Sequence, residues 1–182
     1  WSSETIALSS SGPDSRQLYA NFVVAGDQGV LLCAVAEKQG AAARVWYRGA
    51  SGLPEEISPP EGAEGWGDLS AGAFGSGSGG GNFVLVGKGG RVFRISEASR
   101  QASLISVPTT ASLTGIAYGV KDRAGGRWVA VGACGTILYS LSDTAQQWQM
   151  VQSRVLDDLN AVTFGANSFL AVGEGGIILQ SN

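Results

Sequence analysis

The sequence predicts an all-β protein, a four-bladed β-propeller whose antiparallel blades each hold three or four strands. Three observations predict this fold: one glycine-containing phrase recurs four times, a second apolar phrase precedes it in three of the repeats, and the spacing of the repeats is that of a propeller blade. The chain has 182 residues, the length of one domain, and is long enough to bury roughly two thirds of the surface of the unfolded chain.

The recurring phrase reads aromatic-x-x-x-Gly-x-x-Gly-x-apolar-apolar, and its first glycines are 61, 45 and 41 residues apart. The four copies are FVVAGDQGVLL (22–32), FVLVGKGGRVF (83–93), WVAVGACGTIL (128–138) and FLAVGEGGIIL (169–179). Apolar runs on both sides of the glycines predict two strands, and glycine accepts the positive φ that a tight turn between them needs. A phosphate-binding loop would be followed by a helix, whereas an apolar strand follows each of these turns. Each copy therefore predicts a β-hairpin.

A second phrase precedes three of these hairpins and predicts the innermost strand of each blade. It occurs as LSAGAFG (69–75), LTGIAYG (113–119) and LNAVTFG (159–165), with a weaker version, SETIALSS (3–10), before the first hairpin. A fourth strand is expected at ARVWYRG (43–49), ASLISVP (102–108) and QWQMVQS (147–153), and none is visible after the last hairpin. Four strands in a period of about 40–50 residues are typical of propeller blades, which bury their faces against one another.

These strands divide a single propeller domain (1–182) into blades at approximately 1–50, 66–110, 111–154 and 155–182. A long loop (50–65), rich in Pro, Gly and Glu, joins the first two blades. We expect the four blades to close into a monomeric disk; the alternative is a partial ring that closes with another chain or a second copy. The last strand, within IILQSN (177–182), would present a free edge to which a partner strand or another copy could add.

Composition and charge exclude several classes of function. Charged residues are 15% of the chain and the net charge is −3, so the sequence lacks the basic face of a nucleic-acid-binding protein. No apolar run reaches the length of a membrane span. Histidine is absent, no nucleophile motif is present, and Cys33 and Cys134 lack metal-ligand spacing and are expected to be unpaired. We therefore expect no enzymatic activity, no metal and no cofactor.

The third repeat, LTGIAYG…RWVAVGACGTILYSLSDTAQQW (113–148), resembles units of the bacterial-neuraminidase-repeat (Asp-box) β-propellers. Within that group the repeats are most similar to those of the photosystem II stability/assembly factor family, and the resemblance is strongest over residues 111–182. The Asp-box pattern, Ser-x-Asp-x-Gly-x-x-Trp, survives only as SDTAQQW (142–148), in which Ala145 stands at the glycine position. The resemblance implies a propeller fold and a role in assembly through a protein partner. Such repeats specify a fold more closely than a function.

The predicted function is that of a non-catalytic binding module, a protein-interaction or assembly scaffold that uses one loop face of the propeller. The repeats keep their apolar positions and vary the turn tips (Asp-Gln, Lys-Gly, Ala-Cys, Glu-Gly), which favours one site for a protein over four equal sites. The partner-binding residues predicted on this acidic face and in the long loop are Asp27, Lys88, Glu174, Asp68, Asp157, Asp158, Glu55 and Glu56. The alternative is a carbohydrate-binding lectin that uses Trp46 and Trp148. Residue 1 is Trp and not Met, so a processed chain is expected. The sequence does not fix the compartment, and an extracytoplasmic or secreted location is favoured.

Overall fold

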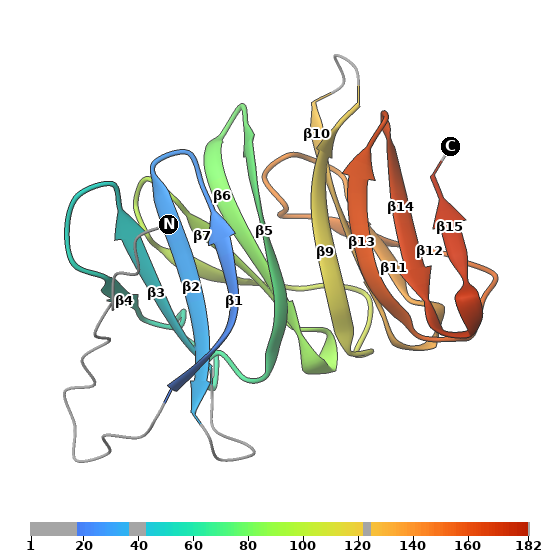
Figure 1. Cartoon of the computed structure of the whole chain (residues 1–182), viewed down its shortest axis with the longest axis horizontal. Coiled ribbons are helices and arrows are strands. Elements are labelled where there is room, and N and C mark those ends of the chain that lie inside the picture. Colours follow the sequence, from blue (N-terminus) through green and yellow to red (C-terminus); the bar gives the residue numbers. More distant parts are fainter. Residues whose placement is uncertain (1–17, 37–42, 122–124, 182) are drawn as a thin grey trace, which may run out of the picture.

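The computed structural model describes residues 18–36, 43–121 and 125–181 and folds them into four antiparallel sheets that follow one another along the chain (Figure 1). These sheets are the four blades, and their strands neighbour one another in the order of the sequence. The all-β, four-bladed architecture predicted from the repeats is confirmed.

Blade 1 holds β1 (Leu18–Ala25), β2 (Gly29–Ala36), β3 (Arg44–Gly49) and β4 (Glu55–Ile57). Blade 2 holds β5 (Leu69–Gly77), β6 (Gly80–Gly87), β7 (Val92–Ser96) and β8 (Ala102–Ile105). Blade 3 holds β9 (Leu113–Val120), β10 (Gly126–Gly132), β11 (Ile137–Ser140) and β12 (Trp148–Val151). Blade 4 holds β13 (Leu159–Gly165), β14 (Ser168–Gly173) and β15 (Ile178–Gln180). Short 3-10 turns join the second and third strands of blades 2 to 4: η1 (Lys88–Gly90), η3 (Ala133–Gly135) and η4 (Glu174–Gly176).

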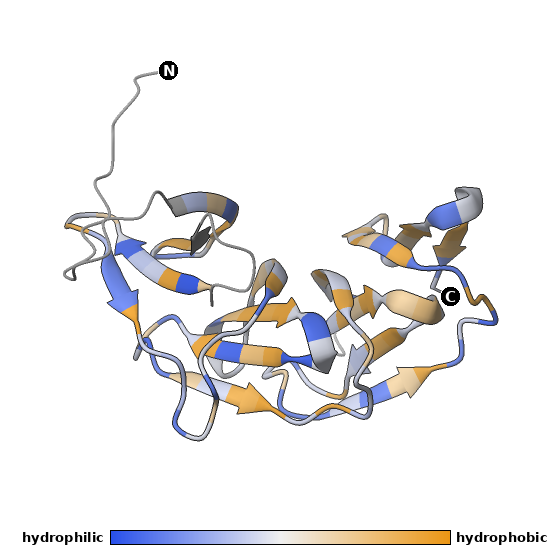
Figure 2. Cartoon of the chain, turned by 90° about the horizontal axis from the view of Figure 1, so that it is seen from below, coloured by the Kyte–Doolittle hydropathy of each residue, from blue (hydrophilic) through white to orange (hydrophobic). Residues whose placement is uncertain are grey.

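The four blades form an open arc. Their inner strands pack in sequence, β1 against β5, β5 against β9 and β9 against β13, and among the described residues β13 does not pack against β1. Figures 1 and 2 place blades 1 and 4 at opposite ends of the arc. The closed disk expected from the sequence is therefore not formed by the described residues. Blades 1 and 2, and blades 2 and 3, pack face to face from their innermost to their outermost strands, which leaves too small a turn per blade for four blades to close a ring.

Each blade has two apolar faces, because successive side chains of a strand point to opposite sides of the sheet. We call the face toward the preceding blade the leading face, and the face toward the following blade the trailing face. Between blades 2 and 3, the trailing face of blade 2 contributes Val84, Val86 and Val92, all fully buried. The leading face of blade 3 packs against them with side chains from all four of its strands, the largest of which are Ile116, Trp128, Leu138 and Trp148.

The Gly-x-x-Gly turns of blades 2 to 4 are shaped by close backbone contacts. In blade 3 the amide of Ala133 donates to the carbonyl oxygen of Ser112 at 2.9 Å, which holds the turn against the start of the inner strand. A Cβ on Gly132 would lie 2.1 Å from that oxygen. Gly135 has a φ of +65°, and a Cβ there would lie 2.0 Å from the carbonyl oxygen of Val155, in the segment that leads to blade 4. Both positions therefore need glycine.

The first glycine phrase occupies a different place in its blade from the other three. FVVA (22–25) ends β1, the innermost strand, so GDQG (26–29) joins the first strand to the second, whereas in blades 2 to 4 the phrase joins the second strand to the third. The prediction that all four turns share one face is therefore wrong for Asp27, which lies at the opposite end of the strands (Figure 1). The phrase specifies a tight hairpin, and such a hairpin fits either pair of neighbouring strands. The inner strand predicted at 3–10 lies outside the described residues.

The remainder of blade 1 is displaced by one strand in the same way. The segment predicted as the fourth strand, 43–49, contains the third strand β3, and the predicted loop 50–65 supplies the fourth strand β4, which pairs with β3. β4 has the sequence EEI, which is too short and too polar to show the alternation by which a strand is recognised in a sequence.

Cys33 and Cys134 are both unpaired, as expected. Cys33 is fully buried in the core between blades 1 and 2. Burial raises the pKa of its thiol to about 12, so the thiol stays protonated at neutral pH and is a poor nucleophile. Cys134 is exposed at the tip of η3.

Candidate functional site

The predicted partner-binding residues at the turns are largely engaged within the molecule. The Lys88 ammonium pairs with the Asp68 carboxylate at 2.8 Å. Oδ1 of Asp158 accepts the amide of Cys134 at 2.8 Å, and the carbonyl oxygen of Asp158 accepts the amide of Glu174 at 2.9 Å. Asp158 therefore links turn η3 of blade 3 to turn η4 of blade 4.

The two glutamates predicted in the long loop lie in β4 and are paired as well. Glu56 forms a two-point ion pair with Arg44 on β3. The hydrogen bond to Glu56 is the main reason why the pKa of the Arg44 guanidinium is raised. Oε2 of Glu55 lies 3.7 Å from Nε of Arg100, a residue of blade 2. Exposed pairs of this kind stabilise a fold little, but they neutralise the carboxylates that a basic partner would need.

Three of the eight predicted residues are exposed and make no side-chain hydrogen bond or ion pair with the part of the chain that the structure describes. Glu174 lies in η4, Asp157 lies two residues before β13, and Asp27 lies at the other end of the strands in blade 1. The structure thus brings Asp157, Asp158 and Glu174 together beside η4, pairs Asp68 with Lys88 in blade 2, and places Glu55, Glu56 and Asp27 in blade 1.

The two tryptophans of the lectin alternative are packed into the protein. Trp46 is 3% exposed, and the guanidinium of Arg44 lies 4.9 Å from its ring centroid. Trp148 is 7% exposed, and its indole N–H donates to the carbonyl oxygen of Ala145 at 2.9 Å. Neither ring presents an open face on which a sugar could stack.

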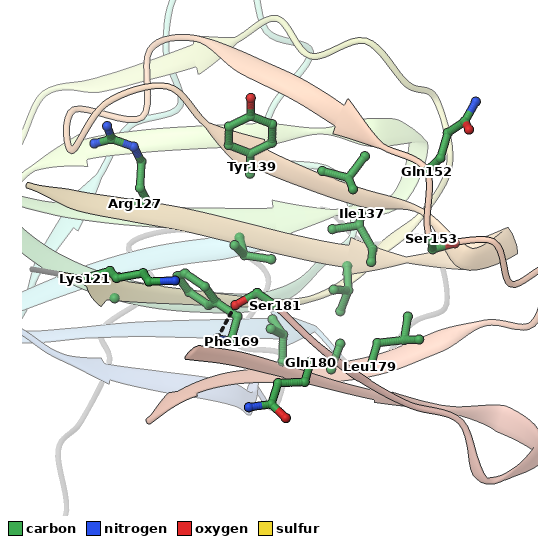
Figure 3. Close-up of a pocket in the computed structure, with 16 residues that line it drawn as sticks. Lys121, Arg127, Ile137, Tyr139, Gln152, Ser153, Phe169, Leu179, Gln180 and Ser181 are labelled. Carbon is green, nitrogen blue, oxygen red and sulfur yellow. Dashed lines mark hydrogen bonds between the residues drawn. The ribbon is translucent and has the colours of Figure 1, made fainter. Parts of the chain in front are cut away.

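A hollow with an apolar lining lies between blades 3 and 4 (Figure 3). Its volume is about 410 Å³, within the range of sites that bind small molecules or peptide side chains. Eight apolar side chains from the two facing sheets line it: Val129, Val131, Ile137 and Val151 from blade 3, and Val162, Phe169, Ala171 and Leu179 from blade 4. We call this hollow the 3–4 cleft.

The 3–4 cleft exists because the described part of blade 4 lacks the strand that fills the equivalent place between blades 2 and 3. There, β12 and the turn before it place Trp148 and the fully buried Ala145 in the core that blade 3 shares with blade 2. In blade 4 the outermost described strand is β15, the third strand of its sheet. As a result Phe169, the counterpart of the fully buried Trp128, is only partly buried.

The backbone of β15 borders the open side of the cleft. One edge of β15 pairs with β14, with Ile178 opposite Val172 and Gln180 opposite Leu170. The other edge has no partner strand among the described residues. Unpaired N–H and C=O groups on a strand edge are a template for another strand. The cleft therefore combines an apolar floor with a backbone edge that can form hydrogen bonds.

Two cations lie at one end of the cleft. Figure 3 shows Lys121 beside Phe169, and Arg127 at the same end of the cleft, on blade 3. At that end the amide of Phe169 donates to the hydroxyl of Ser181 at 2.9 Å, which holds the last described residues of the chain against β14. A bound segment would therefore meet positive charge at this end and apolar side chains along the rest of its length.

The sequence did not predict this cleft, because all blade faces, including the one that holds Phe169, were expected to be buried against one another. The sequence did indicate the free edge of the last strand, but it did not indicate the apolar hollow beside that edge; in the described residues β15 is the outermost strand of blade 4. Among the described residues, a sheet face whose residues are suited to burial therefore has no cover over its outer part.

Within the described ranges, no group of three His, Cys, Asp or Glu side chains is placed to hold a metal ion, and no helix is both long and apolar enough to cross a membrane. No family model and no curated protein sequence matches the chain. Among solved structures, the chain is similar to the crystal structure of the computationally designed Ika4 protein. The TM-score is 0.60 and the sequence identity 16%, over 92% of this chain and 93% of that chain. A likeness at this identity shows the fold alone.

Proposed function

We propose that the chain is a non-catalytic protein-interaction module that binds an extended segment of a partner protein in the 3–4 cleft, as an added strand along β15. The observation that carries the proposal is the apolar cleft of about 410 Å³ beside the unpaired edge of β15. In strand addition, main-chain hydrogen bonds supply affinity and alternate side chains enter pockets and supply specificity.

The fourth strand of blade 3 indicates which segment would fit. On β11, Ser140 is opposite Trp148 and Leu138 is opposite Met150, and Trp148 enters the core between blades 2 and 3. By the repeat, an aromatic residue of the partner would lie opposite Ser181 and enter the cleft. An acidic residue near that aromatic residue would lie at the end that holds Lys121 and Arg127 and gain from their charge.

The lectin alternative has less support, because its two tryptophans are almost fully buried. The acidic group beside η4 (Asp157, Asp158 and Glu174) remains a predicted contact of the loop face, and strand addition in the cleft does not require it.

The test uses a peptide of sequence LSDTAQQWQMVQ, which copies residues 141–152 of the chain, the strand that occupies the equivalent place in blade 3. The peptide carries a fluorescent label, and its anisotropy is followed as the protein is added. We expect saturable binding that weakens about tenfold or more when the tryptophan of the peptide is replaced by alanine, since a buried aromatic residue is a typical hot spot.

Two neighbouring residues of β15 provide the matched pair of variants. Leu179 lines the cleft, whereas Ile178 points to the opposite face of the sheet. We expect Leu179→Lys to weaken peptide binding about tenfold or more and Ile178→Lys to leave it unchanged, with circular dichroism showing that both variants fold. If Leu179→Lys unfolds, Leu179→Ala takes its place, with a smaller loss expected. No saturable binding, or equal binding by a folded cleft variant and Ile178→Lys, would overturn the proposal.

A further inference from the structure

The trailing face of blade 4 ends the arc and is apolar but uncovered. Its Leu170, Val172 and Ile178 occupy the positions that Val84, Val86 and Val92 hold in blade 2. The three valines of blade 2 are fully buried against blade 3, whereas the three residues of blade 4 are 39%, 38% and 68% exposed. We call Leu170, Val172 and Ile178 the trailing end face.

The leading face of blade 1 ends the arc on the other side and is apolar too. Val23 of β1 is 64% exposed and Val30 of β2 is 39% exposed. Together with Leu32 they line a hollow of about 200 Å³ that also includes Trp46, Arg48 and Pro54. We call Val23, Val30 and Leu32 the leading end face. Contiguous exposed apolar surface at both ends of one molecule is unusual for a monomer and marks interaction sites.

From these two faces we propose that two copies of the chain close one eight-bladed ring. The trailing end face of each copy packs against the leading end face of the other. Within the chain, a trailing face packs on a leading face three times, between blades 1 and 2, 2 and 3, and 3 and 4. The ends of the arc present the remaining face of each kind. A second copy offers both complements at once, and the two new interfaces are identical by a two-fold axis through the centre of the ring.

A second copy of the chain fits the two end faces better than further copies or a single added strand, for two reasons. Propellers hold between four and eight blades, so two four-bladed arcs reach the upper end of that range and three would exceed it. Figure 2 shows the arc open on one side, with blades 1 and 4 apart. A single added strand would cover one edge only, whereas the second copy covers the whole width of both end sheets.

This inference is independent of the proposed function. The 3–4 cleft is lined by the leading face of blade 4, which includes Phe169 and Leu179. The ring contact uses the opposite face of the same sheet, which includes Ile178. A ring of two copies therefore leaves both clefts available to a partner segment, and either idea can fail without the other.

The test is the mass of the full chain in solution, measured by sedimentation equilibrium and by light scattering after size-exclusion chromatography at micromolar concentration. We expect a dimer of about 37 kDa, twice the 18.6 kDa of one chain. Ile178→Lys and Val23→Lys each place an ammonium in both new interfaces and should shift the mass to that of one chain. Leu156→Lys is the matched control, because Leu156 is 87% exposed and lies in the segment before β13, outside both end faces. It should remain a dimer.

Mixing the two monomeric variants distinguishes the proposed contact from any other. A pair made of one Ile178→Lys chain and one Val23→Lys chain has one interface with both substitutions and one interface with neither. We expect the mixture to recover a dimer population that neither variant forms alone. A monomeric parent chain, a dimer that survives both substitutions, or a mixture that shows no recovery would each overturn the eight-bladed ring.

Discussion

The boundary between blades 2 and 3 and the boundary between blades 3 and 4 are built from the same repeat, yet one is filled and the other is open. Between blades 2 and 3, Trp128, Ala145 and Trp148 are buried to 7% exposure or less. Between blades 3 and 4, the counterpart of Trp128 is the partly buried Phe169, and a cleft of about 410 Å³ takes the place of the outer strand. The fourth strand of the following blade, more than the residues of the facing sheets, decides whether a blade boundary is complete.

The largest expected effect is a difference between two matched aromatic truncations. Trp128→Ala removes a fully buried ring and the hydrogen bond of its indole N–H to the carbonyl oxygen of Asp143, at 2.8 Å, and should cost about 3–5 kcal/mol of the free energy of unfolding. Phe169→Ala removes a ring that already borders a cleft and should cost about 1–2 kcal/mol. Urea unfolding followed by circular dichroism measures both. Equal costs would mean that the two boundaries are equally packed.

A second comparison uses the last glycine of the turn in blades 3 and 4. Gly135→Ala should destabilise by about 3 kcal/mol, because its Cβ would lie 2.0 Å from the carbonyl oxygen of Val155 and its φ is +65°. Gly176→Ala should cost only about 1 kcal/mol, because its φ is +77° but nothing lies within 4 Å of the added Cβ. Thermal unfolding of the two variants tests this order, and a cost for Gly176→Ala as large as that for Gly135→Ala would contradict it.

A smaller effect concerns pH. Asp143 links blade 3 to blade 2, because its Oδ2 accepts the amide of Ser78 at 2.7 Å and the hydroxyl of the same residue at 2.8 Å. These hydrogen bonds, the backbone one first, lower the pKa of Asp143 below its usual value. The stabilisation is therefore present above the unfolded-state pKa, near 4, and is lost as the pH falls through the lower folded-state pKa. Asp143→Asn should show a weaker acid dependence of the unfolding midpoint between about pH 5 and pH 2. An unchanged dependence would mean that the ionised Asp143 carboxylate does not stabilise the contact between blades 2 and 3.

The smallest expected effect is a stabilisation. Cys134 has a φ of +53°, whereas blades 2 and 4 place Gly89 and Gly175 at the same position of the turn, with φ of +69° and +62°. Cys134→Gly relieves the strain of a side chain in the left-handed region, which outweighs the greater freedom of glycine in the unfolded chain. We expect a gain of about 0.5 kcal/mol in the free energy of unfolding, and a loss would show that the exposed cysteine makes compensating contacts.

The repeats were readable from the sequence because their glycines and aromatic residues are fixed by steric contacts within each blade. Gly132 and Gly135 admit no side chain, and Trp128 fills a core, so the same pattern returns wherever the same contacts return. The segments of blade 1 were each assigned to the strand after the one they form, because GDQG (26–29) matches the same hairpin pattern but joins the first two strands. The short strand β4 was missed because EEI has no apolar alternation.

The candidate site was harder to predict than the fold. Charged residues at turn tips were interpreted as partner-binding residues, but the side chains of Lys88, Asp68 and Asp158 already bind other groups of the molecule. The cleft instead depends on which sheet follows which, and on where the described strands end. Neither property belongs to any single motif, so only the assembled blades show that Leu179 faces a hollow and Ile178 faces solvent.

Hydrogen exchange followed by mass spectrometry tests the central comparison most directly. We expect the amides of β10 and β11 to be strongly protected and those of β14 and β15 to exchange faster, and we expect the 141–152 peptide to slow exchange in β15 while leaving β10 and β11 unchanged. Equal protection of the two hairpins in the free protein, with no change on addition of the peptide, would contradict the account, because it would mean that the boundary between blades 3 and 4 is already complete.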